Sequence, residues 1–274
     1  MASEGGTKID RALRSAARLA AGLTGVSTAV VTGDPYAGAV TGWATNELLT
    51  IGQEVMDRVT QRAAVRVGAS RLIIAADLQE REHQGDGPRS DGFFDERGVL
   101  RPEAHELLES ILLASANSFE ERKLPYLAHM YDGVAYDSTV SAGDSLFLAH
   151  MADQLTFRQA QGLAVFGRHG AGDTALEIEL GQIEAEHRSG AKVVDPAMFE
   201  ELRDLGNRRL VGAWAGDGRV RDPSTTWGAD WEGVSIGQVA LTELGKLLHR
   251  LMRLDDMPAV ERRSWIDAYR GHAR

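Results

Sequence analysis

Apolar residues recur every three or four positions along most of this chain, which is the spacing of a helix with one buried face. The first clear stripe consists of Leu48, Ile51, Val55, Val59 and Ala63. A second helix is expected over residues 70–83, and Gly68 is the position where the first helix would end or kink. Residues 85–98 are dense in turn-forming residues and predict a loop, with Phe93 as its anchor in the core. The pattern predicts a mainly α fold.

Pro102 begins the next expected helix, because proline is favoured in the first turn of a helix. The apolar stripe predicts that this helix continues to about Tyr136, and Pro125 must either kink it or restart it. Ser141 is the expected N-cap of one more helix, since its hydroxyl can accept a hydrogen bond from a free backbone N–H group. Residues 1–152 are therefore expected to form a helical domain.

Residues 19–51 differ from the rest of this domain, because they are rich in Gly and Ala and carry only two charged side chains. The Gly33-Asp34 step, followed by proline, predicts a turn between two short helices. Gly38 and Gly42 are four residues apart, so they share one helix face and would let another backbone approach closely. The segment is expected to form a tight helical hairpin.

A basic amphipathic stretch precedes this hairpin, and its basic residues are Arg11, Arg14 and Arg18. Such a helix could lie on anionic lipid headgroups while the Gly/Ala hairpin inserts and packs against itself. Each arm is shorter than the roughly 20 residues of an ordinary membrane span, so the expected contact is conditional. The favoured alternative is a closely packed soluble hairpin in which Gly and Ala save space.

After residue 152 the pattern changes from helices alone to helices followed by short extended segments. The expected helices cover residues 155–166, 174–187, 195–206 and 242–248, and the expected extended segments cover 208–211 and 234–241. Four short motifs occur in this stretch: LTFRQ at 155–159, LGNRRLV at 205–211, DGR at 217–219 and LTELG at 241–245. These motifs and this order of elements resemble the winged-helix domain of MarR-type proteins over residues 153–254. The resemblance implies a winged-helix-like α+β domain.

That family typically reads DNA with its third helix and its wing. Here the corresponding helix, residues 195–206, has four acidic residues against the single Arg203, so DNA phosphates should repel it. The basic and aromatic side chains that could contact a partner or nucleic acid lie elsewhere, at Arg208, Arg209, Arg219, Arg221, Trp227 and Trp231. Protein contact or dimerisation is therefore favoured over DNA binding.

The composition excludes several classes of chemistry. The chain of 274 residues has no cysteine, so disulfides, thiolate metal sites and thiol nucleophiles are absent. Its net charge is −10, and acidic residues outnumber basic ones in both parts of the chain. Residues 1–152 contain 14 basic and 21 acidic residues, and residues 153–274 contain 16 basic and 19 acidic residues. Neither part is a basic module. No apolar leader of the secretory type opens the chain, which favours a cytoplasmic protein, and the Ala, Arg and Gly content favours a bacterial source.

A metal centre is the one cofactor that the spacing of residues allows. Two Glu-x-x-His pairs occur, Glu80 with His83 and Glu184 with His187. Two such pairs on helices, together with a Glu from each of two further helices, can hold a di-iron centre, and Glu54 and Glu121 could supply these. Chance also produces this spacing in a chain so rich in Glu, and no metal or cofactor is our expectation.

No Walker loop, dinucleotide-binding glycine motif or nucleophile elbow occurs in the chain. The sequence thus predicts two domains, a helical one over 1–152 with its hairpin, and a winged-helix-like one over 153–274 that includes a terminal helix from Pro258. The favoured function is that of a non-enzymatic interaction protein that self-associates or binds a protein partner. Its Gly/Ala hairpin would be either a packing element or a conditional contact with the inner membrane. The alternatives are a DNA-binding transcription regulator and a di-iron helical protein.

Overall fold

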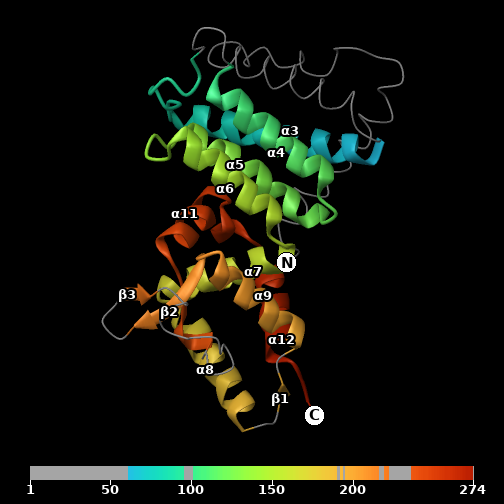
Figure 1. Cartoon of the computed structure of the whole chain (residues 1–274), viewed down its shortest axis with the longest axis vertical. Helices are drawn as coiled ribbons and strands as arrows, with labels where there is room; N and C mark the ends of the chain where they lie inside the picture. Colours follow the sequence, from blue (N-terminus) through green and yellow to red (C-terminus); the bar gives the residue numbers. More distant parts are fainter. Residues whose placement is uncertain are drawn as a thin grey trace. The chain divides into compact units, whose positions relative to one another are not determined.

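The computed structural model describes residues 61–95, 101–189, 192–193, 195–215, 219–221 and 236–273, which are mainly helical (Figure 1). The chain divides into two compact units, Met1–Leu155 and Thr156–Arg274. The predicted hairpin over 19–51, with Gly33, Gly38 and Gly42, lies outside the described residues, as do Arg11, Arg14 and Arg18.

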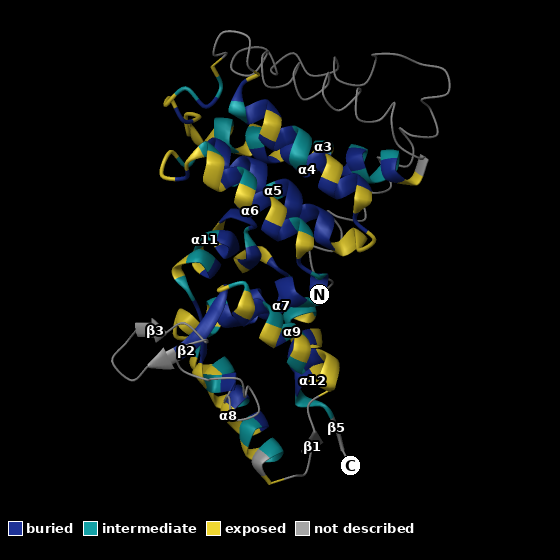
Figure 2. Cartoon of the chain, in the orientation of Figure 1, coloured by how far each residue is buried: buried dark blue, intermediate teal, exposed yellow. Residues whose placement is uncertain are grey.

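Helices form the described part of the first unit. They are α3 (Gln61–Gln84), α4 (Glu103–Asn117), the 3-10 turn η1 (Glu121–Lys123), α5 (Leu124–Ala135) and α6 (Ala142–Gln154). Helix α3 packs against α4 and α5, and α4 packs against α5 and α6. Buried side chains fill the faces that these helices turn toward one another, among them Ile74, Leu108, Leu112, Leu127 and Met130 (Figure 2).

Two expected helix ends in this unit were wrong. Helix α3 runs through Gly68 without a break, because Val67 and Ala69 on either side of it are buried and packing outweighs the low helix propensity of glycine. Helix α4 ends at Asn117, whereas a helix to Tyr136 was expected. Pro125 lies in the first turn of α5, where its missing N–H costs nothing, so it restarts the helix.

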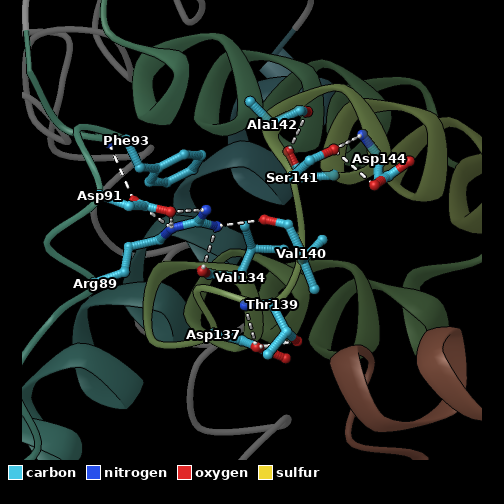
Figure 3. A network of polar contacts seen from close by, with 11 residues as sticks. Arg89, Asp91, Phe93, Val134, Asp137, Thr139, Val140, Ser141, Ala142 and Asp144 are labelled. Carbon is cyan, nitrogen blue, oxygen red and sulfur yellow. Dashed lines mark hydrogen bonds and ion pairs between the residues drawn. The ribbon is translucent and has the colours of Figure 1, made fainter.

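An arginine clamp fastens the loop after α3 to the rest of the unit (Figure 3). The buried Arg89 side chain donates hydrogen bonds to the carbonyl oxygens of Val140, at 2.8 Å, and Val134, at 3.4 Å. It also pairs with the carboxylate of Asp91, and its guanidinium carbon lies 4.6 Å from the ring centre of Phe93. Phe93 is buried, so its expected role as the loop's anchor is confirmed.

The second unit combines helices with two small antiparallel sheets. Its elements are α7 (Phe157–Gly170), α8 (Thr174–Arg188), β1 (Lys192–Val193), α9 (Pro196–Asn207), β2 (Val211–Ala215), β3 (Arg219–Arg221), η3 (Ile236–Gln238), β4 (Val239–Leu241), α11 (Glu243–Leu251), η4 (Leu254–Asp256), α12 (Ala259–Arg270) and β5 (His272–Ala273). Strand β2 pairs with β3 on one side and β4 on the other, while β1 pairs with β5. Helix α7 packs against α8, α9, α11, α12 and β4.

Polar side chains cap several of these helices. Thr156 accepts a hydrogen bond from Gln159 N, and the Gln159 side chain accepts one from Thr156 N, which completes a capping box. Asp195 caps α9 and Thr242 caps α11. In the first unit, Ser141 caps α6 through Asp144 N. Each of these caps satisfies an N–H group that the helix itself cannot bond.

Aromatic packing closes the core of the second unit. The ring of Trp265 stacks on Tyr269 with centroids 5.5 Å apart, and Phe166 meets Trp265 edge-on at 5.4 Å. Gly162 makes room for this cluster, because a Cβ there would lie 3.1 Å from Trp265 Nε1. Helices α7 and α12 are therefore held at close range.

Candidate interaction surface

Helix α9 occupies the third-helix position on which the sequence argument about DNA depended. Its acidic residues have partners within the unit. Asp195 caps the helix through Ala197 N at 2.9 Å, and Glu200 pairs with Arg203 one turn later. The four acidic charges that the sequence argument counted are thus partly offset.

Glu201 and Asp204 connect α9 to α7 and to its own C-terminal end. Both Glu201 oxygens accept from Arg158, each at 2.8 Å. Asp204 Oδ2 accepts from Gln159 Nε2 and from Arg208 Nε, also at 2.8 Å each. These bonds hold the two nearest arginines against carboxylates, so α9 has a nearly neutral surface in place of the basic one that binds phosphates.

The arginines predicted to contact a partner are only partly described. Arg208 lies half-buried against Asp204. Arg209 is exposed in a left-handed backbone conformation, with a φ of 59°. Arg219 and Arg221 belong to β3, opposite Ala215 and Ala213 of β2, and their side chains lie outside the description. Trp227 and Trp231 lie outside the described residues as well.

The two Glu-x-x-His pairs have other bonding partners. His83 Nδ1 lies 2.7 Å from the carbonyl oxygen of Gln79, and Glu80 accepts from Gln84. His187 Nε2 lies 3.1 Å from the carbonyl oxygen of Arg270, and Glu184 accepts from Gly237 N. Glu121 is exposed in η1, and Glu54 is not described. Within the described ranges, no group of three or more His, Asp or Glu side chains could hold a metal ion.

Helix α8 has an exposed side (Figure 2), and the sequence analysis missed a stripe of uncharged residues along it. The face consists of Thr174, Ala175, Ile178, Gly181 and Ala185, and all five are exposed. It lies opposite Leu180 and Ile183, which are fully buried. The signal in the sequence was the spacing of Thr174, Ile178, Gly181 and Ala185, which repeats a helical period on the side away from the core. We call this set the α8 face.

Ionic and aromatic contacts fix α8 on its inner side. Glu179 Oε1 lies 2.5 Å from Arg263 Nη1 and 3.1 Å from Arg270 Nη2, both on α12. The His187 ring meets Tyr269 edge-on at 5.5 Å. The helix is thereby held in one orientation, which keeps the α8 face directed outward.

A polar seam joins α3 to α5 in the first unit. Asp77 Oδ2 lies 2.6 Å from His129 Nδ1, and Arg81 Nε lies 3.4 Å from Asp132 Oδ1, whose carboxylate is fully buried. Arg81 also lies over the ring of Tyr136, with 5.5 Å to its centre. The seam thus adds two ion pairs to the apolar packing of α3 on α5.

Within the described ranges, none of the helices combines the length and the apolar character that crossing a bilayer requires. No protein-family model matches the chain, and comparisons with curated proteins and with solved structures find no match.

Proposed function

We propose that this chain is a non-enzymatic interaction protein that binds a protein partner through the α8 face of a winged-helix-like second unit. The order α7, α8, α9, β2, β3, β4, α11 supports the winged-helix-like arrangement, with an antiparallel pair of strands where a wing would lie. The offset charges of α9 support protein contact over DNA contact, because the arginines beside this helix are already bound to carboxylates.

The observation that carries the proposal is the exposure of Ile178. Its side chain is 59% exposed at the centre of the α8 face, with Gly181 and Ala185 beside it. Leaving an aliphatic side chain of this size in water forgoes about 2 kcal/mol of burial free energy, which a partner could recover. The small neighbours let another backbone approach the helix closely.

The negative charge of α8 indicates what kind of partner surface would bind it. Helix α8 contains four glutamates and one arginine, so its formal charge with neutral His187 is 1 − 4 = −3. Arginines of α12 offset Glu179 and Glu186, while Glu177 is exposed beside Ile178. A second copy of the helix would bring like charges together, whereas an apolar helix flanked by basic residues would be attracted. The proposed partner therefore presents an apolar stripe with a basic border.

The first experiment compares the full-length protein with Ile178→Glu and, as a matched control, Val260→Glu. Val260 is similarly exposed, at 67%, but lies on α12. A partner captured from host extract is identified, purified and titrated against all three proteins. The proposal predicts that Ile178→Glu weakens binding at least about 30-fold, a hot-spot effect of roughly 2 kcal/mol, while Val260→Glu does not.

Two outcomes would contradict the proposal. Equal binding by all three proteins would remove the α8 face from the interface. A wild-type dimer in light scattering that Ile178→Glu converts to a monomer would make the occupant a second copy. Fluorescence anisotropy with a labelled 30-base-pair duplex at low salt tests the DNA alternative, and our proposal predicts a flat curve.

The conditional membrane contact of residues 19–51 remains a prediction from the sequence. Flotation with anionic vesicles, comparing the full chain with a form lacking residues 1–52, tests it directly. Flotation of the full chain alone would make the hairpin a membrane element. If neither form floats while circular dichroism shows both folded, the hairpin is a packing element.

A further inference from the structure

His249 of α11 has its ring packed against α7. Among the histidines of the described second unit, it is the one whose Nε2 is buried without a hydrogen-bond partner. His249 as a whole is only 6% exposed. Its Nε2 atom is fully buried, and none of the described groups bonds to it. The ring edge rests on Gly167 of α7, because a Cβ there would overlap Nε2 and lie 2.7 Å from Cδ2 and Cε1. The missing side chain of glycine is what admits the ring.

The charged groups around this ring offer little compensation for a second proton. Asp255 of η4 has its Oδ2 3.8 Å from Nδ1, the opposite ring nitrogen, and its side chain is 71% exposed. At the facing end of α7 are Arg168, which is exposed, and His169, whose Nδ1 also lacks a hydrogen-bond partner. Strand β4, the third element packed on α11, contributes only Val239, Ala240 and Leu241.

The remaining charges lie on α11 and η4 themselves. Lys246 is paired with Glu243, while Arg250, Arg253 and Asp256 lie close to the same turn. Arg253 has a left-handed φ of 49°, and this turn brings Asp255 back toward the ring. A neutral His249 with its proton on Nδ1 fits this arrangement, because Nε2 then needs no acceptor.

We propose that the contact between α7 and α11 is an acid-sensitive latch, in which protonation of His249 separates α11 from α7 and exposes the apolar face of α11. Protonation places a new N–H group and a positive charge against the backbone at Gly167, where none of the described groups accepts a hydrogen bond from Nε2. Relief requires the ring to reach water, which moves α11 outward. Leu248 and Leu251, both fully buried in the closed state, become accessible.

The direction of the pH response follows from the same geometry. Burial lowers the pKa of His249 below its usual 6.5, and Asp255 only partly opposes this. The open state therefore binds the proton more readily than the closed state. The closed latch is fully stable above about pH 6.5 and loses stability as the pH falls through and below that value.

The test is hydrogen exchange of α11 amides in the full chain at pH 7.5 and pH 5.5, corrected for intrinsic rates. The wild type should open at least about 5-fold more at pH 5.5, because the open state binds the proton that the buried ring resists. His249→Met, which fills the space without titrating, should change less than 2-fold. An equal acid response in His249→Met would overturn the proposal.

Two further variants test the same proposal without replacing His249, in case His249→Met does not fold. Asp255→Asn removes the partial compensation from an exposed position, so it should enlarge the acid response of α11; an unchanged or smaller response would overturn the proposal. His169→Gln tests the neighbouring histidine on α7 and should leave the response intact. Its loss in this variant would assign the effect to His169 and overturn the role of His249.

Discussion

Arg89 donates a 2.8 Å hydrogen bond to the carbonyl oxygen of Val140, which lies 51 residues further along the chain. The same guanidinium reaches Val134 O at the end of α5, and Arg89 N donates to Ala135 O at 3.0 Å. One side chain in the loop after α3 thus bonds the C-terminal end of α5 and the turn that leads into α6. This explains why a charged group is buried at this place: it bonds the carbonyl oxygen of Val140 and gives Val134 O, which also accepts from Asp137 N, a second hydrogen bond.

Removing this clamp should destabilise the first unit. Arg89→Met keeps an apolar stem but removes the hydrogen bond to the carbonyl oxygen of Val140 and the ion pair with Asp91, and we expect a loss of about 2–4 kcal/mol in the free energy of unfolding. Arg89→Lys should lose less than Arg89→Met but more than nothing, because an ammonium cannot reproduce the fork of the guanidinium. Urea titration followed by circular dichroism, with hydrogen exchange of α5, measures both.

Asp91 provides the control for the clamp. Its carboxylate is exposed to solvent, and the hydrogen bond and charge of Arg89 lower its pKa. Asp91→Asn should leave the urea concentration at the midpoint of unfolding almost unchanged, because water screens the lost charge. A fall equal to that of Arg89→Met would show that the ion pair, and not the carbonyl contacts, holds the loop.

Glycines in the second unit differ in how much space a side chain would have at each position. A Cβ at Gly245 of α11 would overlap the backbone carbonyl oxygen of Leu210, which cannot move aside, while a Cβ at Gly181 of α8 would meet open space. Gly245→Ala should therefore cost at least about 3 kcal/mol of stability. Gly181→Ala should gain about 0.5–1 kcal/mol from helix propensity. Thermal unfolding followed by circular dichroism compares the two, and equal effects would contradict this assignment.

The sequence revealed those parts of the fold that depend on local chemistry. Ser141 was identified as a cap from its own side chain, and it caps a helix in the structure. The caps at Thr156 and Thr242 were not identified, although helices were expected to begin there. The uninterrupted α3 could not be foreseen. Its continuation through Gly68 depends on packing against α4 and α5, which are distant in the sequence.

The candidate site was harder to predict for the same reason. Counting charges on residues 195–206 gave an acidic helix, but the partner of Glu201 is Arg158 on α7, 43 residues away. The α8 face was missed because Ile178 follows helical spacing as a core residue would, and only the fold shows that its side points away from Leu180. Spacing identifies a face but does not show what covers it.

Tyr269 should make the second unit sensitive to high pH. Burial, with a contribution from Glu184, raises the pKa of Tyr269 to about 12. The unfolded chain loses this proton near pH 10, so the folded state binds more protons between the two values, and stability falls as the pH rises through that window. The wild type should lose about 2 kcal/mol more than Tyr269→Phe between pH 9 and pH 11.5, since two pKa units correspond to at most about 2.7 kcal/mol. Parallel pH profiles of the two proteins in urea titrations would contradict the assignment.

Charge removal on α9 distinguishes an interaction helix from a concealed DNA-binding one. In Glu201→Gln with Asp204→Asn, the carboxylates that hold Arg158 and Arg208 become neutral amides, and both arginines become available to phosphates. We expect this double variant to bind a 30-base-pair duplex at 50 mM salt, where the wild type does not, and to lose about tenfold or more in affinity by 200 mM. The matched control, Glu177→Gln with Asp256→Asn, makes the same change in net charge at exposed positions on α8 and η4. An equal gain in the control would mean that net charge alone is responsible, whereas a gain confined to the α9 variant would show that the ion pairs of α9 are what keep this unit from binding DNA.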